Sequence, residues 1–192
     1  SLRSSVTVSP ARAMVRSNDF HGLNSVERAR SMRQVPTRAV VAGVAARHKP
    51  WLQWHGIGTD ISFNAIREAQ QAIYPEAAMQ FIPAEYRESC MDHKLGGRRR
   101  VTAELRARTH FFHSNLLHVD SAPFADFNII FCQNTLIYFE RDRQRWIIDQ
   151  LVDRLRIGGL LVLGAGEDAC WLAQNVRRLQ WPGVCAYQKT GG

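Results

Sequence analysis

Two short, almost wholly apolar runs constrain the fold of this chain most: residues 127–132 (FNIIFC) and 160–164 (LLVLG). Such runs are typical of strands covered on both faces, as in parallel sheets. Between them, residues 141–156 predict an amphipathic helix that ends at Gly158 and Gly159. Its apolar stripe consists of Trp146, Ile147, Leu151, Val152 and Leu155. A strand, a helix and a second strand at this spacing predict an α/β fold with a doubly wound, mostly parallel sheet.

The same alternation is present upstream. Residues 54–61 predict a strand, Ser62 a helix N-cap, and residues 63–74 a helix with Phe63, Ile66, Ala69 and Ile73 at helical spacing. Further predicted elements are a short helix at 83–91, paired strands at 101–106 and 109–114, and a final edge strand at 184–189.

The basic charge is confined to the first quarter of the chain. Residues 1–50 hold nine basic and two acidic residues, a net charge of +7, whereas residues 51–192 hold 16 basic and 15 acidic residues. The first quarter has one aromatic residue, Phe20, and no isoleucine. We therefore predict that residues 1–48 form a basic, unassigned, poorly ordered segment and that the folded domain covers residues 49–192.

Composition also excludes several classes of protein. No stretch approaches the roughly 18 apolar residues that a membrane-spanning helix needs, and residues 1–10 lack the apolar run of a signal peptide. The four cysteines lie far apart, with no zinc-ligand spacing, so we predict no metal site and reduced packing cysteines. A soluble, cytoplasmic protein without membrane insertion is expected.

Polar residues that follow the predicted strands are candidates for a ligand site, because open parallel sheets bind ligands at the carboxyl ends of their strands. Asp60 could accept hydrogen bonds from ribose hydroxyls, or it could be an acid favoured at a helix start. Asn115 could face an adenine edge or stabilise a turn. Asn134 and Tyr138 would share one face if that segment is helical, or be a loop amide and a packing tyrosine. Gln133 and Glu167 also lie at strand ends.

Several motifs together carry a family resemblance. TDIS, FIPAEYRESCM, FFHSNLL and the block at 126–167 resemble the CheR-type family, the S-adenosylmethionine-dependent methyltransferases that esterify glutamates of bacterial chemoreceptors. The resemblance covers about residues 54–189. The sequences FCQNTLIYF and LVLGAGE are closer to the branch linked to type IV pilus chemosensory systems. The resemblance implies a Rossmann-like methyltransferase sheet with a small inserted antiparallel β subdomain at about 96–114.

The resemblance also implies a cofactor, a substrate and site residues. The cofactor would be S-adenosyl-L-methionine, and the substrate the glutamates of the cytoplasmic domain of a chemoreceptor-type protein. Tyr138 would approach the transferred methyl group. The cofactor would be held by Asp60 at its ribose, by Asn115 and Leu116 at its adenine, and by Gln133 and Asn134 at its methionine part. Arg98, Arg99 and Arg100 would dock an acidic receptor segment, unless they are a solvated charge run.

One part of the family pattern is missing. The family carries a Gly-rich, acid-containing loop before the strand that ends in the first acid, but residues 31–54 have no Gly-x-Gly, and no acid lies between Glu27 and Asp60. The N-terminal part is therefore expected to be incomplete and the activity impaired. The alternative is a non-catalytic chemosensory scaffold or receptor-docking module. Nucleic-acid binding is disfavoured, because the basic segment has a single aromatic residue and no recognisable binding module.

Overall fold

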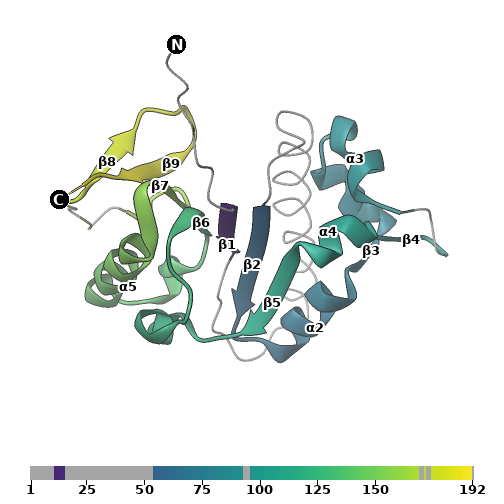
Figure 1. Cartoon of the computed structure of the whole chain (residues 1–192), viewed down its shortest axis with the longest axis horizontal. Coiled ribbons are helices and arrows are strands. Elements are labelled where there is room, and N and C mark those ends of the chain that lie inside the picture. The colour runs from purple at the N-terminus through teal and green to yellow at the C-terminus, as the bar shows by residue number, and fades with distance from the viewer. Residues whose placement is uncertain (1–10, 16–53, 93–95, 169–170, 172–173, 192) are drawn as a thin grey trace, which may run out of the picture.

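The computed structural model describes residues 11–15, 54–92, 96–168, 171 and 174–191 (Figure 1). Its main feature is a seven-stranded sheet in the order β5-β2-β1-β6-β7-β9-β8. All neighbouring strands are parallel except at β9, which runs antiparallel to β7 and β8. This arrangement confirms the predicted α/β fold with a mostly parallel sheet. The strands are β1 (Ala11–Val15), β2 (Trp54–Asp60), β5 (Thr109–His113), β6 (Phe127–Cys132), β7 (Leu155–Leu163), β8 (Val176–Leu179) and β9 (Cys185–Lys189).

The strand β1 corrects one prediction. It lies between β2 and β6, with Val15 in register with Gly58 on one side and Phe131 on the other. These five residues lie in the segment that the sequence predicts to be poorly ordered. A five-residue strand that contains an arginine has too short a pattern to be recognised locally. Residues 1–10 and 16–48 lie outside the described part of the chain, so the predicted domain boundary near residue 48 stays a prediction.

In the described part of the chain, the helices α2 (Phe63–Gln71) and α5 (Arg141–Asp153) flank the sheet. The helix α2 begins after Ser62, whose Oγ accepts a hydrogen bond from the Ala65 N–H at 3.3 Å. It ends at Ala72, which has a left-handed backbone with φ 57°, earlier than the predicted residue 74. The helix α5 connects β6 to β7 and buries its predicted apolar stripe in the main core. Leu155, predicted as the last stripe residue, instead begins β7.

A smaller unit is inserted between α2 and β5, and Figure 1 shows it on the opposite side of the molecule from β8 and β9. Its sheet pairs β3 (Ile73–Pro75) with β4 (Arg98–Arg100) in antiparallel fashion. Its helices are η1 (Glu76–Phe81), α3 (Ala84–Cys90) and α4 (Ala103–Ala107). A separate buried cluster stabilises this unit, formed by Trp54, Ala72, Tyr74, Ala78, Met79, Ile82, Cys90, Met91, Val101 and Leu105.

The unit confirms an inserted antiparallel subdomain but corrects its composition. Residues 101–106, predicted as a strand, contain α4, because alanine, glutamate, leucine and arginine are good helix formers. The strand predicted at 109–114 exists as β5, but it pairs in parallel with β2 in the main sheet. The strand predicted at the C-terminal edge, β9, lies between β7 and β8, so the edge strand is β8.

Candidate functional site

The predicted cofactor residues lie at the carboxyl ends of strands in the main sheet. Asp60 ends β2, and the Ser114 N–H donates a hydrogen bond to the Asp60 carbonyl oxygen at 3.0 Å, which joins the ends of β2 and β5. Gln133 and Asn134 follow β6 directly. The chain order reverses between β1 and β6, with β2 and β5 on one side and β7 on the other. Such a switch point is where open α/β sheets bind ligands.

Asp60 has a role in the local structure, in addition to the ribose contact predicted for its carboxylate. Its side chain is buried, with the residue 3% exposed, and Oδ1 accepts a hydrogen bond from the Ser62 N–H at 2.8 Å. This bond fixes the turn from β2 into α2. The interpretation as a helix-start acid is thus visible in the structure, and the ribose assignment stays a prediction.

Asn115 and Leu116 border a cavity of about 420 Å³. The Asn115 Oδ1 accepts a hydrogen bond from the Leu117 N–H at 2.8 Å and begins the 3₁₀ helix η2 (Leu116–Ser121). The amide NH₂ is therefore the group of Asn115 that could donate to an adenine ring. The cavity wall is mostly apolar and includes Ile57, Leu116, Val119, Phe124 and Phe127. An apolar cavity of this size, bordered by the Asn115 amide, fits the adenine part of a nucleoside cofactor.

An aromatic pair that the sequence analysis missed lies at the same edge. Phe63, at the start of α2, stacks on His113, at the end of β5, with ring centroids 3.7 Å apart and planes inclined by 2°. Phe63 is 71% exposed, whereas Ile66 and Ala69 at the same helical spacing are buried. Phe63 is the first residue of the helix, where a side chain can project past the sheet edge.

The loop after β6 carries Asn134 and Tyr138. Asn134 has a left-handed backbone with φ 52°, and the 3₁₀ helix η3 (Leu136–Tyr138) follows it. The segment does not form a regular α-helix, so the condition for a shared helical face of Asn134 and Tyr138 is not met. Tyr138 is 41% exposed. Gln133 points its amide at β7, with Nε2 donating to the Leu163 carbonyl oxygen at 3.3 Å.

Glu167 organises this loop. It follows β7, is 3% exposed, and accepts four backbone hydrogen bonds. Its Oε1 accepts from the N–H groups of Thr135 and Leu136, both at 2.7 Å. Its Oε2 accepts from Asn134 at 2.9 Å and from Gly164 at 2.6 Å. The sequence placed Glu167 at a strand end but assigned it no role.

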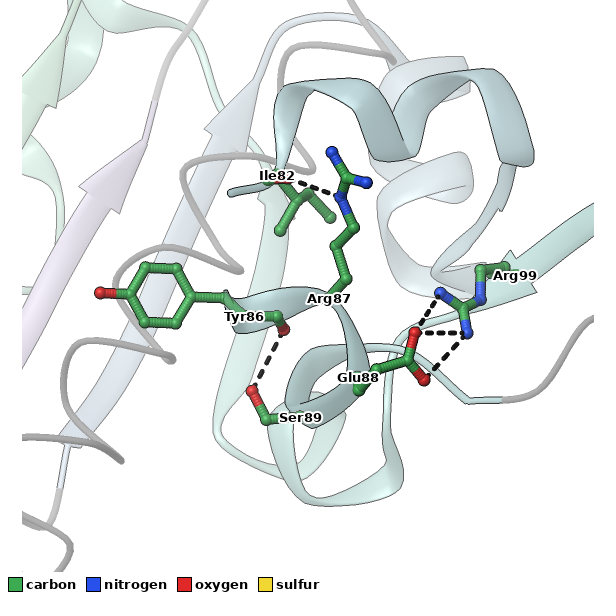
Figure 2. A network of polar contacts seen from close by, with 6 residues as sticks. All are labelled: Ile82, Tyr86, Arg87, Glu88, Ser89 and Arg99. Atoms are coloured by element: carbon green, nitrogen blue, oxygen red, sulfur yellow. Dashed lines mark hydrogen bonds and ion pairs between the residues drawn. The ribbon is translucent and has the colours of Figure 1, made fainter. Parts of the chain in front are cut away.

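The three consecutive arginines of β4 have different surroundings. Arg98 and Arg100 are exposed, whereas Arg99 is buried. Figure 2 shows the Arg99 guanidinium against the Glu88 carboxylate of α3, with Nη1 and Nη2 3.3 Å from Oε1 and Nη2 3.4 Å from Oε2. Arg99 therefore ties β4 to α3 within the small unit, and only Arg98 and Arg100 face solvent.

A second polar cluster lies beside Glu167. Tyr187 of β9 donates its hydroxyl to Asp168, and the Arg178 guanidinium lies 3.5 Å from the same carboxylate. Burial acts to raise the pKa of Asp168, but hydrogen bonds from Tyr187 and Cys185 and the charge of Arg178 outweigh it and lower that pKa. Burial, then the Asp168 hydrogen bond and charge, raise the pKa of Cys185 to about 11. The Cys185 thiol therefore stays protonated and unreactive near neutral pH.

Within the described residues, no set of three or more histidine, cysteine, aspartate or glutamate side chains is grouped to hold a metal ion. No helix in the described part of the chain is long and apolar enough to cross a membrane.

Comparison with known proteins identifies the family. Residues 38–180 match the family model described as "CheR methyltransferase, SAM binding domain". The chain belongs to the CheR methyltransferase family. Its cofactor is accordingly S-adenosylmethionine. The matched region begins after β1.

Similar curated proteins are described as chemotaxis protein methyltransferases. Chemotaxis protein methyltransferase 1 of Pseudomonas aeruginosa is 34% identical over 131 residues, which are 67% of this chain and 47% of that protein. Chemotaxis protein methyltransferase 2 of the same organism is 30% identical over 124 residues, 63% of this chain and 44% of that protein. The chain thus spans less than half the length of these relatives. Among solved structures, TrmN from Thermus thermophilus is 13% identical with a TM-score of 0.47 and covers 94% of this chain and 44% of that chain.

Proposed function

We propose that this CheR-family chain transfers the methyl group of S-adenosylmethionine to glutamate carboxylates in the cytoplasmic domain of chemoreceptor-type proteins, giving glutamate methyl esters. The observation that carries the proposal is the convergence of the family's motif residues at the switch point of the sheet. Asp60 and Asn115 lie on one side of that point, and Asn134 lies on the other.

The chemistry asks for alignment rather than for a base. A glutamate carboxylate is ionised near neutral pH and is itself the nucleophile. The cofactor supplies an activated methyl group on a positively charged sulfur. The protein must therefore hold the carboxylate oxygen in line with that methyl group and exclude water. We assign cofactor placement to Asp60, Asn115, Leu116, Gln133 and Asn134, and alignment of the methyl group to the half-exposed Tyr138.

Recognition of the substrate protein is assigned to the small inserted unit. Arg98 and Arg100 project from β4 into solvent, whereas Arg99 is held by Glu88. Two exposed cations on one short strand suit an acidic segment of a receptor, because opposite charges increase the rate of encounter. The docking role is thus limited to Arg98 and Arg100, and Arg99 contributes by fixing the strand that carries them.

The test is transfer of labelled methyl groups to purified receptor cytoplasmic domains, with base-labile label as the signature of an ester. Tyr138→Phe should lower turnover while leaving affinity for S-adenosylhomocysteine nearly intact, since a benefit that arises in the transition state appears in kcat. Tyr86→Phe in α3 is the matched control and should retain full turnover. Full activity of Tyr138→Phe would remove the alignment role.

A non-catalytic scaffold is the second candidate, and the absence of a Gly-rich acidic loop in residues 31–54 favours it. A scaffold would bind the receptor domain through the small unit without transferring methyl groups. Retained receptor binding by a parent chain that transfers no label would support the scaffold, and label transfer would exclude it.

A further inference from the structure

The Glu167 carboxylate joins two loops that end neighbouring strands. It sits in the turn after β7, which Gly164 begins, and three of its four hydrogen bonds reach the turn after β6. Each of its oxygens accepts two N–H groups. A carboxylate that accepts several backbone N–H groups forms charge-assisted hydrogen bonds, which also hold those N–H groups in one direction.

The turn held by Glu167 leads directly to Tyr138. Glu167 fixes the N–H groups of residues 134, 135 and 136 in succession, across the left-handed backbone of Asn134. The Tyr138 N–H then donates to the Thr135 carbonyl oxygen at 3.3 Å, which closes the 3₁₀ turn. Hydrogen bonds therefore fix the backbone N–H groups of residues 134, 135, 136 and 138.

The geometry requires a carboxylate at this position. The two carboxylate oxygens accept hydrogen bonds from four N–H groups. A glutamine has one acceptor oxygen, and its NH₂ group would face two of those N–H groups, which are also donors. The space around the carboxylate is also filled. A Cβ on Gly164 would overlap the Glu167 Oε2 and would lie 2.9 Å from the Asn134 nitrogen. Gly164 therefore permits the close approach of the two turns.

We propose that Glu167 is a positioning residue for methyl transfer: its carboxylate sets the backbone of residues 134–136 and thereby places Asn134 against the cofactor and Tyr138 against the methyl group. The inference rests on the proposed function for its consequence in turnover. Its structural part, the control of the turn after β6 by a side chain after β7, is independent of that function.

The experiment compares Glu167→Gln and Gly164→Ala with the parent chain, using Asp168→Asn as a matched control. Asp168 is the adjacent carboxylate and is bound to Tyr187 and Arg178 instead of the turn after β6. Amide hydrogen exchange should become about tenfold faster or more at Asn134, Thr135 and Leu136 in both test variants, while β6 and β7 keep their protection. In Asp168→Asn, exchange in that turn should remain as in the parent.

Two functional measurements complete the test. Affinity for S-adenosylhomocysteine should fall several-fold in both test variants. Turnover should fall roughly tenfold to a hundredfold with little change in KM for the receptor domain, the scale expected when reacting groups are displaced by about an ångström. Asp168→Asn should change neither quantity more than about twofold, even if it lowers the melting temperature.

The outcomes separate this inference from the proposed function. Faster exchange confined to the turn, together with weaker cofactor binding, supports the positioning role even if the parent methylates no receptor; in that case only the proposed function fails. Unchanged exchange at residues 134–136, or faster exchange spread evenly over the sheet, overturns the inference. When the parent chain does methylate the receptor domain, parent-like turnover in Glu167→Gln and Gly164→Ala also overturns it.

Discussion

Replacement of Asp60 by asparagine should weaken cofactor binding without disturbing the local fold. The Asp60 Oδ1 accepts the Ser62 N–H at 2.8 Å, and an asparagine oxygen can occupy the same position. What the substitution removes is the negative charge. Hydrogen bonds to charged groups contribute about 1.5–3 kcal/mol and neutral ones about 0.5–1.5 kcal/mol. For two ribose hydroxyls the loss is therefore about 2–3 kcal/mol, or roughly 30- to 150-fold in Kd at about 1.4 kcal/mol per tenfold.

Isothermal titration calorimetry with S-adenosylhomocysteine measures this loss directly. Ser62→Ala is the control, because it removes the hydrogen bond from the Ala65 N–H to the Ser62 Oγ at the start of α2 while the carboxylate stays in place. Loss of such a cap costs about 1 kcal/mol of stability, and the Kd should stay within about twofold of the parent value. A Kd for Asp60→Asn equally close to the parent value would refute the ribose assignment and leave Asp60 with its helix-start role alone.

Three other predictions concern docking, pH and the central strand. Arg98→Glu or Arg100→Glu should raise KM for a receptor domain about two- to fivefold, and the increase should be larger at low salt. Arg141→Glu on α5 is the control and should leave KM unchanged, as initial-rate kinetics at two salt concentrations would show. The fold lowers the pKa of Asp168, so this carboxylate contributes stability that is present above its unfolded pKa of about 3.9 and is lost as pH falls through the folded pKa. Asp168→Asn should therefore destabilise the protein at pH 7, and the difference from the parent should shrink as pH falls below about 3.9 in urea titrations. Deletion of residues 1–15 removes a strand bonded on both sides and should abolish cooperative thermal unfolding in circular dichroism.

The sequence predicted those parts of the fold whose signal is local and strong. The run in β6, the stripe of α5 and the run in β7 each bury large apolar side chains, so their patterns follow from the packing they serve. The strand β1 was missed because it is short and its place in the sheet depends on pairing with β2 and β6, which no local pattern encodes. The strand β5 was predicted with the wrong partner for a related reason, since an alternating pattern does not say which strand lies beside it.

From the sequence, the candidate site could be predicted only from the types of residue that follow the predicted strands. Sequence reasoning selected Asp60, Asn115 and Asn134 because parallel strands bring their carboxyl ends to the same end of the sheet. The sheet order puts the strands that precede Asp60 and Asn115 on one side of the switch point and the strand that precedes Asn134 on the other. Sequence reasoning could not find the role of Glu167, because that role depends on the direction of four backbone N–H groups in two turns. A buried acid shortly after a strand that ends in glycine is a usable signal only once the neighbouring turn is known. Residues that bind ligands can therefore be read from side-chain chemistry, whereas a residue that positions them acts through the backbone and becomes visible only in three dimensions.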